Sequence, residues 1–213
     1  VDGFILKSSS PSCGLISTNI YSKKSPIPVK KGSGLFAKGI IEKFPNHPKE
    51  EEKRLNNPFI REHFYTSIFT LADFRRVNDI SSLYKYHAKH KYLLMSYNQI
   101  LMTKMGNIAA DNKNKKVSNI IKDYYNFLLL LFSKKSKVPT NINTQTHIMG
   151  YFKKLLTSKE KEHFLKLIEL YRKRKIPISS VNSVLQSWII RFENNYLMEQ
   201  SFLNPFPKGL IEK

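Results

Sequence analysis

Residues 84–97 bring phenol rings, imidazoles and ammonium groups into one short stretch, Tyr-Lys-Tyr-His-Ala-Lys-His-Lys-Tyr-Leu-Leu-Met-Ser-Tyr. Lys neutralises phosphate, His can donate a hydrogen bond to it and Tyr can stack on a base, so an anionic, ring-bearing partner suits this mixture. The candidate contacts are Tyr84, Lys85, His87, Lys89, His90 and Lys91. The same residues also fit an ordinary amphipathic helix, with a buried stripe that includes His90 and a solvated basic face. The stretch by itself favours that simpler interpretation.

Two further stretches repeat this mixture of aromatic, imidazole and cationic side chains. Their candidate contacts are His147, Tyr151, Lys153, Lys154, Arg172 and Arg174. Gly150 lies within a predicted helix, where glycine costs about 1 kcal/mol relative to Ala, so the close approach of another helix or a ligand would explain it. Each stretch alone fits a solvated helix end. Convergence of all three on one surface would instead predict a binding site.

The charge balance points to polyanions as partners. Lys and Arg total 36 against 16 Asp and Glu, which gives a net charge of +20 and a pI near 9.9. Such a charge attracts polyanions over a distance and makes their binding sensitive to salt. We therefore expect tRNA or another nucleic acid first and an anionic membrane surface second, although the abundance of Lys, Asn and Ile also fits a nucleotide bias.

Catalytic or metal chemistry has less support in the residue pattern. His87 and His90 share a helix face and His147 lies on another predicted helix, but no carboxylate stands at ligand spacing. Nothing next to Cys13 activates its thiol, and the sequence contains no glycine-rich phosphate loop and no HExxH motif. Two alternatives to nucleic-acid binding stay open: an enzyme that uses the three histidines, and a domain that docks an acidic protein, for example in DNA repair.

The cysteine and apolar content bears on the cellular compartment. Cys13 is the only cysteine, so an intrachain disulfide is excluded and a reducing, cytoplasmic compartment fits. The longest apolar run, residues 127–132, is far shorter than the ~20 residues that span a bilayer. We therefore expect this run to be a buried helix segment, and of the two possible polyanionic partners we expect nucleic acid and no membrane. No charged-then-apolar leader opens the sequence, so we also expect no secretion signal.

The hydrophobic pattern predicts a mainly α fold, a multi-helix bundle that follows a short, incomplete α/β segment. Residues 4–6 form an apolar run before a polar loop, which is typical of a buried strand, although no neighbouring segment offers it a partner. Residues 35–41 predict a short helix. Prolines within 43–48 mark the expected boundary between a domain at 1–43 and a helical domain at 44–213.

Beyond this boundary every segment has helical period. Asn57 with Pro58 predicts one helix start, Asp79 can cap another, and Thr157 with Glu160 has the spacing of a capping box. The segment 117–134 is apolar on most of its circumference, so we expect it at the centre of the bundle. The expected helices span 57–78, 84–97, 98–110, 117–134, 141–156, 157–175 and 180–194.

Several motifs give the chain a family resemblance. About four-fifths of it, residues 44–213, resembles the YbgA-type domain of unknown function. Residues 1–41, with the loop 7–14, are similar to the last part of the thiouracil desulfidase (TudS-like) domain, which precedes the helical domain in longer relatives. The YbgA-type motifs are Glu50-Glu51-Glu52, Arg61-Glu62-His63-Phe64, His87-x-x-His90-Lys91-x-Leu93-Leu94, Asn143-x-x-x-His147-x-x-Gly150-Tyr151-Phe152-Lys153, Tyr171-Arg172, Ile176-Pro177 and Pro205-x-Pro207.

The resemblance implies chemistry that composition alone does not. The fused, RudS-like proteins remove sulfur from 4-thiouridine in tRNA, and their helical domain is the expected RNA-binding part. Their desulfidase domain holds a [4Fe-4S] cluster on three cysteines, and its open iron accepts the sulfur. Carried over by motif, Cys13 would be one cluster ligand and Ser10 the catalytic serine, with Ser12 as the second choice.

The sequence departs from this pattern in its ligand set. The family places the other two cluster cysteines, and the catalytic glutamate, in sequence that precedes residue 1. One thiolate cannot hold a cluster that needs cysteine-type ligands on most of its irons. We therefore expect this chain alone to hold no cluster and to be inactive as a desulfidase. Its expected role is that of a tRNA-binding module, either a fragment of a longer enzyme or a degraded copy.

Overall fold

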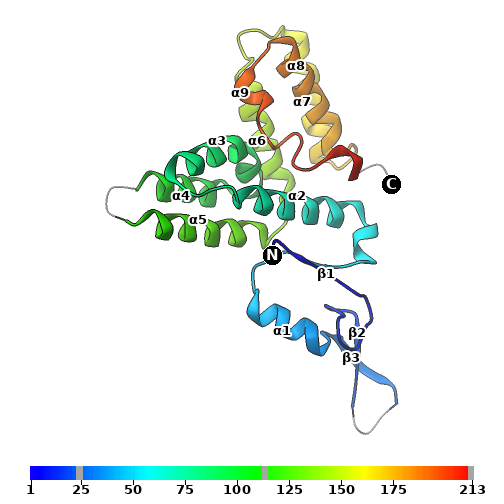
Figure 1. Ribbon diagram of the computed structural model, residues 1–213. Helices are drawn as coiled ribbons and strands as arrows, with labels where there is room; N and C mark the ends of the chain where they lie inside the picture. The colour runs from blue at the N-terminus through cyan, green and yellow to red at the C-terminus, as the bar shows by residue number, and fades with distance from the viewer. Residues whose placement is uncertain (23–25, 112–114, 211–213) are drawn as a thin grey trace. The chain divides into compact units, whose positions relative to one another are not determined.

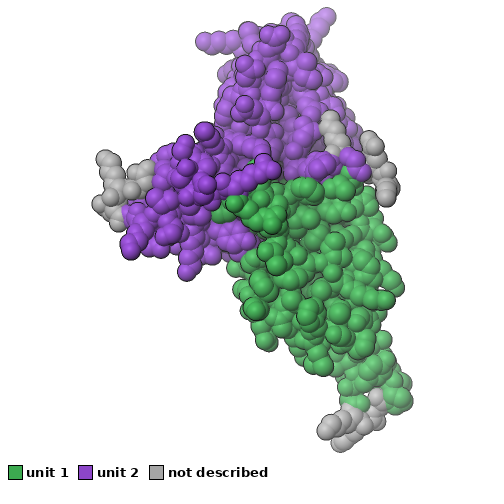
Figure 2. All heavy atoms as spheres, viewed as in Figure 1, with its two compact units in different colours: residues 1–75, 210–213 green, residues 76–209 purple. Residues whose placement is uncertain are grey.

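The computed structural model describes residues 1–22, 26–111 and 115–210 (Figure 1). Most of these residues are helical and the strands are short, so the predicted mainly α fold with a short α/β segment is confirmed. The chain forms two compact units, coloured separately in Figure 2. Unit 1 comprises residues 1–75 with Leu210, and unit 2 comprises residues 76–209. The expected boundary at residue 43 stays a prediction, because a compact unit and an inherited domain are different properties.

Unit 1 contains a parallel pair of strands. β1 (Phe4–Leu6), the predicted strand, pairs with β4 (Lys49–Glu51), so that Phe4 lies opposite Lys49 and Leu6 opposite Glu51. A parallel pair needs a long crossover connection, which explains why no neighbouring segment offered a partner. The sequence gives no sign of β4 because its lysine and two glutamates are residue types depleted in strands.

The other elements of unit 1 lie between and after these two strands. As predicted, Asn57 caps α2: its Oδ1 accepts hydrogen bonds from the N–H groups of Phe59 and Ile60, at 3.0 and 3.3 Å. The expected helix at 35–41 is also present. The elements are β2 (Thr18–Tyr21), antiparallel to β3 (Pro28–Gly32), α1 (Leu35–Lys43), the 3-10 helix η1 (Arg54–Asn56) and α2 (Pro58–Phe74).

Unit 2 is built around α3. This helix packs against α4, α5 and α6, and α6 in turn packs against α7 and α8 (Figure 1). The segment 117–134 was expected at the centre, but α3 occupies that place, and Leu130 on α5 is 43% exposed. The elements are α3 (Ile80–Tyr97), α4 (Gln99–Ala110), α5 (Val117–Phe132), α6 (Val138–Gly150), α7 (Ser158–Arg172), α8 (Ile178–Arg191), α9 (Asn195–Met198) and the 3-10 helix η2 (Lys208–Leu210), whose last residue falls in unit 1.

Two predicted helix starts in unit 2 are confirmed in atomic detail. The carboxylate of Asp79 accepts the N–H of Ser82 at 2.7 Å, and the Ser82 hydroxyl accepts the N–H of Asp79 at 3.1 Å. Thr157 and Glu160 form the same reciprocal box at α7, where the Thr157 N–H donates to the Glu160 carboxylate at 2.7 Å. These contacts satisfy N–H groups that a helix start would otherwise leave without partners.

The ends of α7 and α8 each hold a residue other than glycine in the left-handed backbone conformation, which is energetically unfavourable. Each helix closes with the paired backbone hydrogen bonds of a Schellman motif: after α8, the N–H of Asn194 donates to Ile189 and that of Glu193 to Ile190. The motif requires a left-handed residue, which is usually glycine. Here the positions hold Arg174, with φ of 55°, and Glu193, with φ of 48°. A side chain in this conformation costs about 1 kcal/mol.

Glu193→Gly should therefore stabilise unit 2, by about 1 kcal/mol, because glycine adopts positive φ without steric cost. Thermal unfolding followed by circular dichroism measures the shift. Glu193→Ala is the matched control, since it removes the same charge but keeps a Cβ. An equal gain from both variants would show that the charge, and not the backbone conformation, was responsible.

The capping box at α7 should make stability depend on pH. Hydrogen bonds from the N–H and hydroxyl of Thr157, followed by the guanidinium of Arg191, hold the pKa of the Glu160 carboxyl below its ordinary value of 4.5. A lowered folded-state pKa means that the carboxylate stabilises the fold above about pH 4.5, and that this contribution is lost as the pH falls through the folded-state pKa. Glu160→Gln should thus lower the melting temperature at pH 7, and the deficit should shrink below pH 4.5. If the loss in melting temperature stays constant with pH, or if Glu199→Gln causes an equal loss, the capping box is not the source of the pH dependence.

Candidate nucleic-acid interface

Three tyrosines from separate parts of unit 2 meet in one cluster, named here the tyrosine cluster: Tyr92, Tyr151 and Tyr196. The Tyr92 hydroxyl donates to the Tyr151 hydroxyl at 2.9 Å. The rings of Tyr151 and Tyr196 are stacked, with centroids 6.1 Å apart and planes 27° apart. Tyr92 is buried, whereas Tyr151 and Tyr196 remain 45% and 37% exposed. The cluster therefore exposes two aromatic rings, those of Tyr151 and Tyr196, which pack next to the buried ring of Tyr92.

The phenols of Tyr92 and Tyr196 are hydrogen-bonding groups and not anions at neutral pH. Burial, followed by the hydrogen bond with Tyr151, raises the pKa of Tyr92 above its ordinary range. Burial, followed by the proximity of Tyr151, also raises the pKa of Tyr196. Neutral rings do not repel the phosphates of a nucleic acid, and they can stack on its bases.

The position of Tyr151 depends on where α6 ends. A helix was expected through residue 156, but α6 stops at Gly150 and the chain continues as turns. Phe152 is buried and anchors this turn by stacking on Phe192 at 5.5 Å, whereas Leu155 is 55% exposed. Apart from the chain next to Gly150 and the backbone of its own helix, no described atom lies within 4 Å of a Cβ built there. Another helix therefore does not approach Gly150 closely, and the approach of a ligand stays a prediction.

The position of Tyr196 depends on the buried side-chain amide of Gln200, which forms hydrogen bonds with main-chain groups of α3. Gln200 Nε2 donates to the carbonyl of Ala88 at 2.8 Å, and Gln200 Oε1 accepts the N–H of Tyr92 at 3.4 Å. One side chain thus bonds to both members of a helical i to i+4 pair. The N–H of Ser201 adds a bond to the carbonyl of Lys89 at 3.1 Å. These bonds fix the segment that follows α9 along α3, and so place Tyr196 beside Tyr92.

Cationic residues adjoin two members of the tyrosine cluster, Tyr92 and Tyr151. The Nζ of Lys91 lies 6.0 Å from the centre of the Tyr92 ring. Lys153 and Lys154 are exposed in the turn that begins at Tyr151. The predicted stretches around residues 84–97 and 147–154 therefore meet at the contact between Tyr92 and Tyr151.

The first turns of α3 extend this basic region. Lys85, Lys89 and Tyr92 recur at spacings of four and three, which places them on one face of the helix. Both lysines are exposed, and Tyr84 beside them is exposed as well. The ammonium groups of Lys85 and Lys89 thus lie on the same face of α3 as Tyr92, which belongs to the tyrosine cluster.

The histidines of α3 do not share that exposed face. His90 is 3% exposed, and its Nδ1 forms a 2.7 Å hydrogen bond with the hydroxyl of Ser201. It belongs to the buried stripe that the helical period predicted, and the expectation that it contacts RNA has no support in this arrangement. A buried, hydrogen-bonded imidazole of this kind holds the fold together.

His87 is turned toward α4 and α5. Its Nδ1 lies 2.9 Å from the Tyr124 hydroxyl, and a Cβ at Gly106 would lie only 3.2 Å from its Nε2. Burial, followed by the positive charges of Lys91 and His90, lowers the pKa of His87 to about 4. The ring is therefore neutral at pH 7 and its Nδ1 is paired with Tyr124, so the expectation that it contacts RNA has no support in this arrangement.

The remaining predicted contacts lie elsewhere in unit 2. His147 is exposed in the last turn of α6. Arg172 is paired with Glu169 at 2.8 Å, and Arg174 occupies the left-handed position after α7. Tyr171 is buried, and its hydroxyl accepts a hydrogen bond from Asn141 at 3.0 Å. These partners of Arg172 and Tyr171 lie outside the tyrosine cluster, so they do not link the third patch to the first two.

The loop that holds Ser10 and Cys13 lies in unit 1. The N–H of Cys13 donates to Ser10 Oγ at 3.1 Å, Cys13 is a partly exposed free thiol, and Ser12 is exposed. The buried carboxylate of Glu51 shapes the loop, because its Oε1 accepts the N–H groups of residues 15–17 at 2.7 to 3.1 Å.

These residues do not fit an iron-sulfur cluster. Among the described residues, no three His, Cys, Asp or Glu side chains lie close enough together to hold a metal ion. Cys13 is the single thiol of the whole sequence. A four-iron cluster needs more thiolates than this chain provides, so we assign no chemical step through it.

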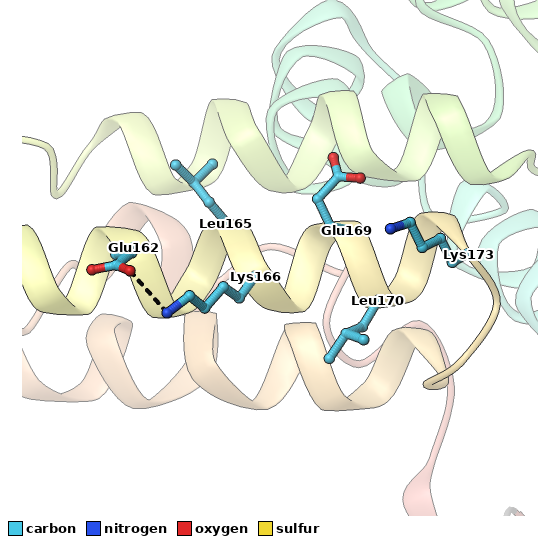
Figure 3. A pocket seen from close by; sticks show the side chains of 6 residues that line it. All are labelled: Glu162, Leu165, Lys166, Glu169, Leu170 and Lys173. Atoms are coloured by element: carbon cyan, nitrogen blue, oxygen red, sulfur yellow. Dashed lines mark ion pairs between the residues drawn. The ribbon is translucent and has the colours of Figure 1, made fainter.

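A surface hollow in unit 2 lies along α7 (Figure 3). Acidic and basic side chains alternate along it, and Lys166 is paired with Glu162 at 2.8 Å. It therefore lacks the excess of positive charge that a phosphate-rich ligand needs. The lining residues come from α7 and the residue that follows it: Glu162, Leu165, Lys166, Glu169, Leu170 and Lys173.

The sequence patterns missed three residues of the cluster region. Tyr92 lay within the highlighted stretch but was not singled out. Tyr196 and Gln200 lie in a segment without a clear period, and their contacts reach more than one hundred residues back along the chain. The only available signal was the presence of an aromatic residue close to a polar one.

The helices in the described part of the chain also bear on membrane insertion. None of them is both long and apolar enough to cross a bilayer.

Comparisons with known proteins give the chain a family. A family model described as "Protein of unknown function (DUF1722)" matches residues 91–207, more than half of the chain. The uncharacterized protein YbgA of Escherichia coli (strain K12) is 21% identical over 146 residues, which cover 66% of this chain and 86% of that protein. No solved structure matches. The expected YbgA-type membership is confirmed, while the TudS-like remnant stays a prediction. The chain belongs to the DUF1722 family of proteins of unknown function.

Proposed function

We propose that unit 2 binds nucleic acid, with tRNA as the expected partner, through the exposed groups around the tyrosine cluster. The observation that carries the proposal is the contact between Tyr92 and Tyr151, because it joins Lys91 on α3 to the basic turn after α6. We name this region the lysine–tyrosine surface: Lys85, Lys89, Lys91, Tyr151, Lys153, Lys154 and Tyr196.

The charge of the chain supports a polyanionic ligand. A net charge of +20 attracts nucleic acid over a distance, and each lysine that neutralises a phosphate releases bound counterions. Because counterion release depends on salt, the logarithm of the binding constant should fall by about 0.7 to 0.9 per phosphate contact for each tenfold rise in salt. The exposed tyrosine rings add a contact that does not depend on charge.

The burial of the histidines favours binding over catalysis by this unit. His90 is enclosed and hydrogen-bonded to Ser201, and His87 is neutral and bonded to Tyr124. The two imidazoles therefore have separate structural partners, and neither joins His147 in a shared site among the described contacts. The lysines and exposed tyrosines of the lysine–tyrosine surface take over the role that the sequence pattern gave to the histidines.

The family resemblance suggests the larger setting of this binding. We propose that the lysine–tyrosine surface holds tRNA for a 4-thiouridine desulfidase whose catalytic domain resembles the segment that includes Ser10 and Cys13. With one cysteine, the present chain would bind the RNA without removing sulfur from it. The two parts of the proposal are separable, because RNA binding by unit 2 does not require an iron-sulfur cluster.

Reversing two lysine charges tests the binding surface. Lys91→Glu combined with Lys154→Glu should abolish tRNA binding at moderate salt, because two phosphate contacts are replaced by repulsion. In fluorescence anisotropy titrations over a range of salt concentrations, any residual binding should show a shallower salt slope, by about 1.4 to 1.8 for two lost contacts.

The matched control is Lys134→Glu combined with Lys135→Glu, two exposed lysines in the segment after α5. This pair changes the net charge equally but lies outside the lysine–tyrosine surface, so it should reduce affinity only slightly. Equal losses in both variants would indicate attraction by net charge alone. Unchanged binding by the Lys91 and Lys154 variant would end the proposal.

A further inference from the structure

The exposed rings of Tyr151 and Tyr196 have a feature that charge attraction does not explain, which is their mutual stacking at the surface. Building on the proposed function, we infer that this pair is a stacking platform for an unpaired base. The unit would then recognise a loop or bulge of the RNA and not its double-stranded stems. The inference assigns a role to Tyr196 and a ligand class to the lysine–tyrosine surface.

The platform is exposed although its rings already pack on each other. Tyr151 and Tyr196 keep 45% and 37% of their surface open. The bases of an A-form stem are stacked inside the helix, where an exposed ring cannot reach their faces, whereas an unpaired base can be splayed out onto an aromatic side chain. A ring pair at the surface therefore distinguishes unpaired from paired nucleotides.

The platform is also held in place before any ligand arrives. Tyr92 holds Tyr151 through the 2.9 Å bond between their hydroxyls. α9 carries Tyr196, and its start is fixed by Asn194, whose Oδ1 accepts the N–H of Leu197 at 3.0 Å. The Gln200 amide then ties the end of this segment to α3. Rings that are ordered in advance lose little conformational entropy when a base stacks on them.

Cations stand where the backbone of such a nucleotide would run. Lys153 and Lys154 follow Tyr151 in the same turn, and Lys91 lies beside the Tyr92 ring. Stacking platforms next to a basic track are the usual means by which proteins bind unpaired strands. The platform supplies preference for unpaired bases, and the lysines supply attraction to any RNA.

A comparison of three RNAs with the wild-type chain tests this without any substitution. The first is a stem with an unpaired loop, the second replaces the loop bases with abasic residues, and the third is an uninterrupted duplex of equal charge. The intact loop should bind about tenfold tighter than the other two, as expected for one base stacked on an aromatic ring. Equal affinity for the intact and abasic loops would overturn the inference.

Substitution of Tyr196 assigns the effect to the platform. Tyr196→Leu should lose the preference for the intact loop and keep its affinity for the duplex, whereas Tyr196→Phe keeps the ring and should retain the preference. With 2-aminopurine in the loop, the wild-type chain and the Phe variant should quench its fluorescence, and the Leu variant should not. Equal losses of affinity for loop and duplex in the Leu variant would show a purely structural role and overturn the inference.

The outcomes separate this inference from the proposed function. If the Lys91 and Lys154 variant loses all RNA binding while the wild-type chain does not distinguish the intact from the abasic loop, the lysine–tyrosine surface stands and the stacking platform fails. If that lysine variant binds every RNA as the wild-type chain does, both fail.

Discussion

The surface of unit 2 depends on one buried amide. Gln200 bonds to the carbonyl of Ala88 and the N–H of Tyr92, and so joins the end of the chain to the helix at the centre of the unit. A buried polar side chain is tolerated only when its donors and acceptors are satisfied, and here the partners are main-chain groups of a helix. Because this bond lies between α9 and α3, it determines which side chains can meet at the surface. Together with the bonds of Ser201 to Lys89 and His90, it holds Tyr196 beside Tyr92.

The same constraint separates structural from exposed polar groups on α3. The face that carries Tyr86 and His90 is enclosed, and Ser201, which follows Gln200, satisfies the imidazole. The face that carries Lys85 and Lys89 stays in solvent. One helix thus contributes polar side chains to the core and to a basic surface at once. The separation follows from a general rule: a buried polar group needs a fixed partner, whereas an ammonium group is best left in water.

Local signals in the sequence predicted much of the fold. Helix starts at Asn57, Asp79 and Thr157 follow from side chains that satisfy N–H groups only a few residues away, and the period of α3 placed His90 in the core. Contacts between distant segments had no such signal. The strand Lys49–Glu51 consists of residue types that strands disfavour, and Gln200 resembles any polar tail residue. The packing of His87 had no local signal, because the space that receives its ring is provided by Gly106 on another helix. Contacts between distant segments bring together two of the three predicted basic patches.

The most direct test of the central claim is photo-crosslinking, because 4-thiouridine in tRNA forms covalent bonds with side chains that touch it. A tRNA that carries this nucleoside is irradiated with the full chain, and the crosslinked peptides are identified by mass spectrometry. Crosslinks should concentrate in the peptides that contain Lys91, Tyr151 or Tyr196, which come from three separate segments of unit 2. Crosslinks confined to Arg172 and Arg174, or to the loop around Cys13, would contradict the claim that RNA is held at the tyrosine cluster.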